Sequence, residues 1–258
     1  MVLGVREVPD KYIVRFVSQS SGAGKTHVAS RIVEYLSRKG YLVGVVKHCA
    51  SGVNLEDKDS EKYVNAGAST VLLSTTGLAV MYKRGHEDVL EAGLPYLIEP
   101  IIIVEGFKES KIGDAVIVAR DINEFLRLRE LVKGVIAVYL NNPDTRINLD
   151  LPIYRPGEEE KLAEFIEERA LKHYISQLPG SNCQLCGFES CHKFLFRYLR
   201  GGNTWCPVIS DISLLIDGVE VPINPFVKSI FKNTIRGMIQ SLKGVPSRPR
   251  EIRIWIRE

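Results

Sequence analysis

Residues 11–47 carry the pattern that most constrains how this chain can fold. Lys11–Ser18 is an apolar, β-branched run that predicts a buried strand. Lys25–Lys39 has apolar residues at helical spacing and is followed by Gly40, a residue typical of helix ends. Tyr41–Lys47 predicts a second buried strand. A strand, a helix and a strand in this order form a βαβ unit, which requires a parallel sheet.

Further elements continue the alternation of strands and helices. Apolar runs predict strands at Thr70–Ser74, Ala79–Tyr82, Ile101–Glu105, Ala115–Val118 and Val135–Leu140. Helical spacing predicts helices at Glu61–Ala66, Glu87–Ala92, Ile122–Leu131 and Glu158–Glu168. The order of these elements predicts an α/β fold with a mainly parallel sheet and helices on both faces.

A glycine-rich loop joins the first strand to the first helix. Its residues are Ser21, Gly22, Ala23, Gly24, Lys25 and Thr26. Small residues let backbone N–H groups approach phosphate oxygens, and the helix N-terminus adds its dipole, so this loop predicts a P-loop that binds a nucleoside triphosphate. We expect Lys25 to bridge the β- and γ-phosphates and Thr26 to ligate Mg²⁺. A chance glycine turn before a helix is the alternative.

One P-loop position departs from the full G-x-x-x-x-G-K-T pattern. Gln19 stands where that pattern has its first glycine. Because glutamine stiffens the turn from strand to loop, it would weaken nucleotide affinity or slow hydrolysis.

Acidic residues follow two of the predicted strands. Glu105 closes the run Ile101–Val104, at the strand end where α/β sheets place site residues, and is expected to hold Mg²⁺ or to orient water. Asp57 and Asp59 lie in the loop after the second strand and could reach the same metal. An ordinary strand-end glutamate and solvated loop charges are the alternatives.

Two weaker signals lie near strand ends. Asn141 and Asp144 form N-x-x-D, which faintly resembles the guanine-reading N-K-x-D of GTPases, and a plain Asx turn is the alternative. His48 is a candidate for contact with the triphosphate or with water. The lone Cys49 is more typical of a small buried residue than of a nucleophile.

These motifs together resemble the MobB family, molybdopterin-guanine dinucleotide biosynthesis protein B, over about residues 11 to 168. The motifs, in the order found in the family, are Gly22–Thr26, Lys47-His48, Asp59-Ser60, Asn65–Ala68 and Glu105–Lys108. The resemblance implies a dimeric GTP-binding protein that assists the enzyme joining GMP to molybdopterin. It places Lys25 and Thr26 at the phosphates and Glu105 and Asp59 near the metal. The segment Cys49–Lys58 lacks the family's usual His pair and D-x-x-G run.

Four cysteines gather late in the chain. Cys183, Cys186, Cys191 and Cys206 have the spacing C-x2-C-x4-C-x14-C, which in a reducing compartment predicts a metal site rather than disulfides. Four thiolates suit a 4Fe–4S cluster or structural zinc. Leu178–Cys191 resembles the small iron–sulfur domain of corrinoid/iron–sulfur proteins and Rnf-type electron-transport subunits, which favours the cluster. Such a cluster would be either redox-active or structural.

The remaining features predict the domain boundaries, the kinds of partner and the cellular compartment. We expect a nucleotide-binding domain over residues 1–168, an iron–sulfur domain over 169–210, and a hairpin-helix-strand unit over 211–258, ending in a strand at 251–257. A net charge of +3 predicts neither a nucleic-acid nor a membrane partner. The absence of a long apolar run and of a signal peptide predicts a cytoplasmic protein.

Three functional hypotheses follow. The first is a GTP-binding accessory protein of molybdenum or tungsten cofactor biosynthesis, a homodimer with weak GTPase activity and a guanylyltransferase-type or molybdoenzyme partner. The second is a nucleotide-gated iron–sulfur electron carrier serving a metalloenzyme or a corrinoid acceptor. A zinc-stabilised scaffold with a degenerate P-loop is a third. These residues do not separate GTP from ATP.

Overall fold

The structure is a computed structural model of the chain. It describes residues 11–20, 22–49, 52, 58–142, 149–178, 180–184, 186–202, 206, 212, 214–217, 219–221, 225–245, 252 and 254–256. The chain divides into two compact units, each described by itself. The first comprises Val8–Tyr174 and Leu199–Gly202, and the second comprises Met1–Glu7, Ile175–Tyr198 and Asn203–Glu258.

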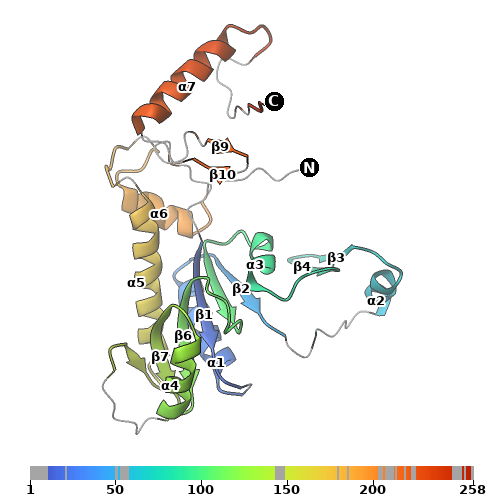
Figure 1. Cartoon of the computed structure of the whole chain (residues 1–258), viewed down its shortest axis with the longest axis vertical. Helices are drawn as coiled ribbons and strands as arrows, with labels where there is room; N and C mark the ends of the chain where they lie inside the picture. The colour runs from blue at the N-terminus through green and yellow to red at the C-terminus, as the bar shows by residue number, and fades with distance from the viewer. Residues whose placement is uncertain are drawn as a thin grey trace. The chain divides into compact units, whose positions relative to one another are not determined.

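A six-stranded sheet forms the centre of the first unit, and all its neighbouring strands are parallel (Figure 1). In spatial order the strands are β2 (Val43–Lys47), β5 (Ile101–Glu105), β1 (Tyr12–Val17), β6 (Asp114–Ala119), β7 (Val135–Leu140) and β8 (Ile153–Tyr154). The strand that leads into the glycine-rich loop therefore lies in the interior of the sheet. This confirms the predicted, mainly parallel α/β fold.

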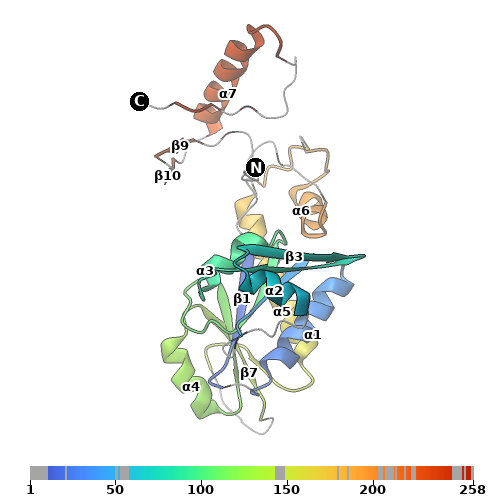
Figure 2. The ribbon, with the colours of Figure 1, turned by 90° about the vertical axis from the view of Figure 1, so that its right-hand side faces the viewer.

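Helices cover both faces of this sheet. Figure 2 shows α4 (Ile122–Leu131) and α1 (Lys25–Arg38) on opposite sides of the strands. On the α4 face, Val17 of β1 packs with Phe125 and Leu128. On the α1 face lies α5 (Glu159–Gln177), which contacts α1 through polar side chains. The predicted helix Glu158–Glu168 is too short, because buried apolar residues at helical spacing continue to Tyr174.

The chain between β2 and β5 forms smaller elements. They are α2 (Lys58–Asn65), the antiparallel pair β3 (Thr70–Thr75) and β4 (Leu78–Lys83), α3 (Leu90–Gly93) and the single 3₁₀ turn Leu94–Tyr96. The hairpin is a sheet of its own and adds no strand to the central sheet. The helix predicted at Glu87–Ala92 begins later, because Val89 is extended.

The second unit holds α6 (Cys191–Leu199, whose last residue belongs to the first unit), the hairpin β9 (Leu215–Ile216) and β10 (Val219–Glu220), and α7 (Pro225–Gln240). The β9–β10 pair confirms the hairpin predicted within residues 211–258, and Asp217, directly after β9, has φ 52°. Residues 252 and 254–256 are in no strand, so the terminal strand predicted at 251–257 is not observed there. Across the described parts of both units, no helix has the length and apolarity needed to cross a bilayer.

Candidate nucleotide-binding site

The glycine-rich loop has the backbone conformation that its glycines permit. Gly22 and Gly24 have φ angles of 79° and 86°, in the left-handed region that L-residues with a side chain rarely adopt. Gly24 is the N-cap of α1 and, being glycine, has no side chain with which to cap the helix. The first N–H groups of α1 are therefore available to an anion, which the helix dipole also favours.

Lys25 folds back over this loop. Its ammonium donates hydrogen bonds to Ser18 Oγ at 2.5 Å and to the carbonyl oxygen of Ser20 at 3.0 Å. Partial burial lowers the pKa of Lys25, and the carboxylate of Glu105 opposes this shift. A charged amine held over the loop by neutral oxygens can exchange those partners for phosphate oxygens, as the sequence predicts.

Thr26 and Glu105 come together at the start of α1. The Thr26 hydroxyl donates to Glu105 Oε1 at 2.8 Å. The second oxygen of Glu105 lies 3.6 Å from Nζ of Lys47, at the end of the neighbouring β2. The pair predicted to share Mg²⁺ thus places a hydroxyl and a carboxylate side by side, and these are oxygen ligands that Mg²⁺ prefers.

Asn141 contacts the glycine-rich loop from the β7 side of the sheet, opposite to the β5 side that carries Glu105. It follows β7, and its Nδ2 donates to the carbonyl oxygen of Ala23 at 2.8 Å. A Cβ at Gly24 would lie 3.6 Å from its Oδ1. The structure therefore places Asn141 against the glycine-rich loop itself. Its predicted partner Asp144, together with Ser21 and Asp57, lies outside the described residues.

Asp59 has other contacts. It lies in the first turn of α2, is exposed, and pairs with Lys62 of the same helix at 2.8 Å. A role of Asp59 at the metal stays a prediction.

The ends of β2 and β5 also bring together two motifs of the sequence, Lys47-His48 and Glu105–Lys108. His48 Nε2 lies 2.9 Å from Asp88 Oδ2, and its ring lies 4.9 Å from that of Phe107. Gly106 has φ 100°, and a Cβ there would lie 2.8 Å from His48 Cβ, so only glycine fits. The sequence carried no signal for Asp88, which follows β4 and is 40 residues from His48. Cys49, predicted to be buried, is exposed, because it follows the end of β2.

Residues 13–141, half of the chain, match the family model described as "Molybdopterin guanine dinucleotide synthesis protein B", MobB. The chain belongs to the MobB family. The match contains all of the loop, Glu105 and His48, and it ends at Asn141.

Individual MobB relatives agree with this assignment. The Escherichia coli molybdopterin-guanine dinucleotide biosynthesis adapter protein is 31% identical over 160 residues, which cover 57% of this chain and 87% of that protein. A Methanocaldococcus jannaschii protein, provisionally named as the same adapter, is 27% identical over 245 residues, 91% of this chain and 93% of its own length. That second alignment extends beyond the MobB domain.

Solved MobB structures share the fold. The crystal structure of a molybdopterin-guanine biosynthesis protein B (MobB) is 27% identical and superposes with a TM-score of 0.50, covering 61% of this chain and 99% of the other. Bacillus subtilis MobB, 22% identical, has a TM-score of 0.51 over 61% of this chain and 97% of its own.

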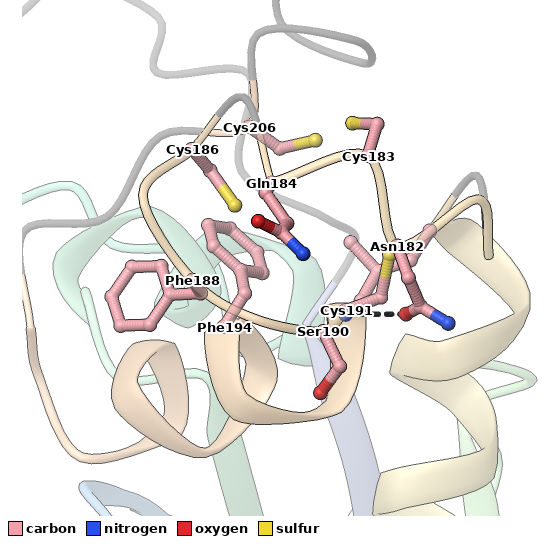
Figure 3. A pocket seen from close by; sticks show the side chains of 10 residues that line it. Asn182, Cys183, Gln184, Cys186, Phe188, Ser190, Cys191, Phe194 and Cys206 are labelled. Atoms are coloured by element: carbon pink, nitrogen blue, oxygen red, sulfur yellow. Dashed lines mark hydrogen bonds between the residues drawn. The ribbon is translucent and has the colours of Figure 1, made fainter.

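The four cysteines lie beyond the MobB match. Cys183, Cys186, Cys191 and Cys206 line one pocket in the second unit (Figure 3). None of them forms a disulfide. In the parts of the chain that the structure describes, no group of three or more His, Cys, Asp or Glu side chains is arranged so that it could hold a metal ion.

Proposed function

We propose that this protein is a GTP-binding accessory protein of molybdopterin-guanine dinucleotide biosynthesis. The observation that carries the proposal is the hydrogen bond from Thr26 to Glu105, at the N-terminus of a helix whose N-cap is a glycine, within a MobB domain. The adapter names of the E. coli and M. jannaschii relatives support the same pathway.

Triphosphate binding follows from the chemistry of these residues. The N–H groups of the loop and of the first turn of α1 would receive the phosphate oxygens. Lys25 would leave Ser18 and Ser20 for the β- and γ-phosphates. Thr26 and Glu105 would hold Mg²⁺, which neutralises phosphate charge when bound.

Hydrolysis by this site is expected to be slow. The carboxylate of Glu105 is already engaged by Thr26 and Lys47, which leaves it poorly placed to take a proton from water. Gln19 adds a stiffer turn than the usual glycine. A slow GTPase suits a protein that presents nucleotide or cofactor to a partner transferase or molybdoenzyme.

The β3–β4 hairpin supports a homodimer. Leu72 and Met81 are directly paired across the two strands, on one face of the hairpin, and are 65% and 45% exposed. A two-stranded hairpin is only marginally stable when it is isolated in water. We infer that a second copy of the chain covers this apolar surface, and cross-linking with mass measurement tests it.

Calorimetric titration with GTP and Mg²⁺ tests nucleotide binding. Lys25→Ala should weaken GTP binding by about 10- to 100-fold, because a charge-assisted hydrogen bond is lost. The matched control is Lys172→Ala, since Lys172 is exposed and pairs with the exposed Glu168 on α5. Equal affinity of wild type and Lys25→Ala would refute the proposed site.

The accessory role needs a second measurement. Molybdopterin-guanine dinucleotide formation by a guanylyltransferase-type enzyme should rise when the wild-type protein and GTP are added together. The Lys25→Ala protein should give no increase. An identical yield with both proteins would show that formation of the dinucleotide does not depend on nucleotide binding by this protein, and it would refute the accessory role.

A further inference from the structure

The helix α7, drawn in Figure 1, carries an apolar stripe that is open to solvent. Phe231, Ile235 and Met238 recur at the spacing that places side chains on one face of a helix, and Leu242 follows in the turn after it. Phe231, Met238 and Leu242 are 39%, 67% and 60% exposed. Among the α7 side chains that the structure describes, none is buried. An apolar stripe of this kind normally packs against another element, so a partner that covers it is expected.

The stripe borders a hollow of about 470 Å³ in the second unit, which we call the α7 hollow. Its apolar lining comes from α7, from the turn after it and from the C-terminal segment: Ile235, Met238, Ile239, Leu242, Ile252 and Ile254. Pockets of this size enclose ligands, and an apolar lining favours apolar groups. The α7 hollow can therefore receive apolar side chains that project from a partner.

Cations run along one edge of the stripe. Lys232 and Arg236 are four residues apart and therefore lie on one face of α7. Each directly follows a residue of the stripe, which places it about 100° around the helix from the stripe. Lys243 repeats this order in the turn, directly after Leu242, and both Arg236 and Lys243 are exposed. A partner that covers the stripe thus meets positive charge along one of its sides.

Negative charge is missing from this part of the sequence. Residues 221–250 contain six basic residues and no aspartate or glutamate. The face of α7 away from the stripe carries the neutral residues Asn233, Gly237 and Gln240. Complementary charge on a partner gives specificity and faster association, so the cations beside the stripe favour a partner with carboxylates.

An acidic helix fits these features better than a second copy or a bilayer does. A second copy of residues 221–250 has no carboxylate to offer the cations. A helix that lies on an anionic bilayer carries its cations across the polar face, whereas the polar face of α7 is neutral. Protein helices bind apolar grooves through residues at i, i+3, i+4 and i+7, which leaves their flanks free for acidic side chains.

We propose that α7 and the C-terminal segment bind an acidic amphipathic helix of a partner protein. The apolar face of that helix fills the α7 hollow, and its carboxylates pair with Lys232, Arg236 and Lys243. This surface belongs to the second unit and lies beyond the MobB match at residues 13–141. Its test is therefore independent of GTP binding.

Fluorescence anisotropy of the full chain with labelled synthetic peptides tests the proposal. The probe is a peptide of about 20 residues, long enough to form a helix, with leucines at i, i+3, i+4 and i+7 and glutamates beside them. One control peptide has every glutamate replaced by lysine, and a second has the same composition in scrambled order. The glutamate peptide should bind at least about tenfold more tightly than either control.

Variants of α7 separate the contribution of the charges from that of the stripe. The double variant Arg236→Glu, Lys243→Glu should bind the glutamate peptide about tenfold more weakly and should now bind the lysine peptide. Met238→Gln, at an exposed position of the stripe, should weaken binding by about fivefold. Gln240→Glu adds a negative charge on the neutral face of the same helix. It is the matched control and should bind as the wild type does.

Three results would overturn the proposal. One is equal affinity of the wild type for the glutamate and lysine peptides, including no binding of either. Another is unchanged binding of both peptides by the double variant. The third is binding to phosphatidylglycerol vesicles without binding of the glutamate peptide, which would assign the surface to a membrane. Circular dichroism shows whether each variant keeps its helices, and the comparison of peptides on the wild type needs no variant.

Discussion

The hydroxyl of Thr26 donates a hydrogen bond to Glu105 across 79 residues of sequence, at 2.8 Å. This contact joins the start of α1, directly after the glycine-rich loop, to the end of β5. β1 pairs with β5 from Tyr12↔Ile101 to Phe16↔Glu105, so the sheet register fixes where the two side chains meet.

Glu105→Gln should weaken GTP binding in the presence of Mg²⁺ by about tenfold, because a charged oxygen ligand is replaced by a neutral amide. Binding measured in EDTA should change little. Glu109→Gln, an exposed change in the loop after β5, serves as the control. An equal loss with and without Mg²⁺ would show that Glu105 does not act through the metal.

Asn141→Ala should weaken GTP and ATP binding by a similar factor, about fivefold, because the side chain supports the backbone of the loop at Ala23. A residue that reads guanine would instead lower GTP affinity alone. Competition titrations of both nucleotides on wild type and variant separate these two roles.

Arg15→Met should destabilise the first unit by about 3 kcal/mol, because three carbonyl groups lose a buried charged donor. The guanidinium is fully buried and donates to the carbonyl oxygens of Ile112, Phe107 and Lys133. Urea unfolding measures the change. Arg31→Met, at an exposed pair with Glu34, should stay within about 0.5 kcal/mol of wild type.

Stability should fall between about pH 10 and 12, partly through Tyr41. Burial, with a hydrogen bond to Glu167, raises the pKa of Tyr41 to about 12 from 10.0. Because the unfolded phenol ionises first, its contribution is complete below pH 10 and is lost as the pH rises toward 12. The urea midpoint of the Tyr41→Phe variant should fall less steeply with rising pH in this range than the midpoint of the wild type. A slope identical to wild type would contradict the assignment.

Sequence patterns predicted the elements whose periodicity is strong. The bounds of Ile101–Glu105, Ile122–Leu131 and Val135–Leu140 are the same in sequence and structure, because each is an apolar run or a helical stripe ended by turn residues. The separate β3–β4 sheet could not be foreseen, since strand neighbours depend on long-range packing that local propensity does not encode.

In the candidate site, too, local sequence signatures predicted some residues, while contacts between distant residues were not predicted. Lys25, Thr26 and Glu105 were predicted because a glycine-rich loop and a strand end have local signatures. The contacts of His48 with Asp88 and of Asn141 with Ala23 link residues 40 and 118 positions apart, and only the folded chain reveals them. Asp59, predicted beside the metal, is paired within its own helix.

Residues 48–100 leave the central sheet at the end of β2 and return to it at β5, the strand directly beside β2. The five register pairs from Val43↔Ile101 to Lys47↔Glu105 hold the two ends of this excursion together. Loop-closure entropy changes only slowly with length. Insertions, deletions or replacements in the segment between β2 and β5 should therefore change the free energy of unfolding only a little. Changes in this segment would leave the register between β2 and β5, and with it the positions of Lys47 and Glu105, unchanged.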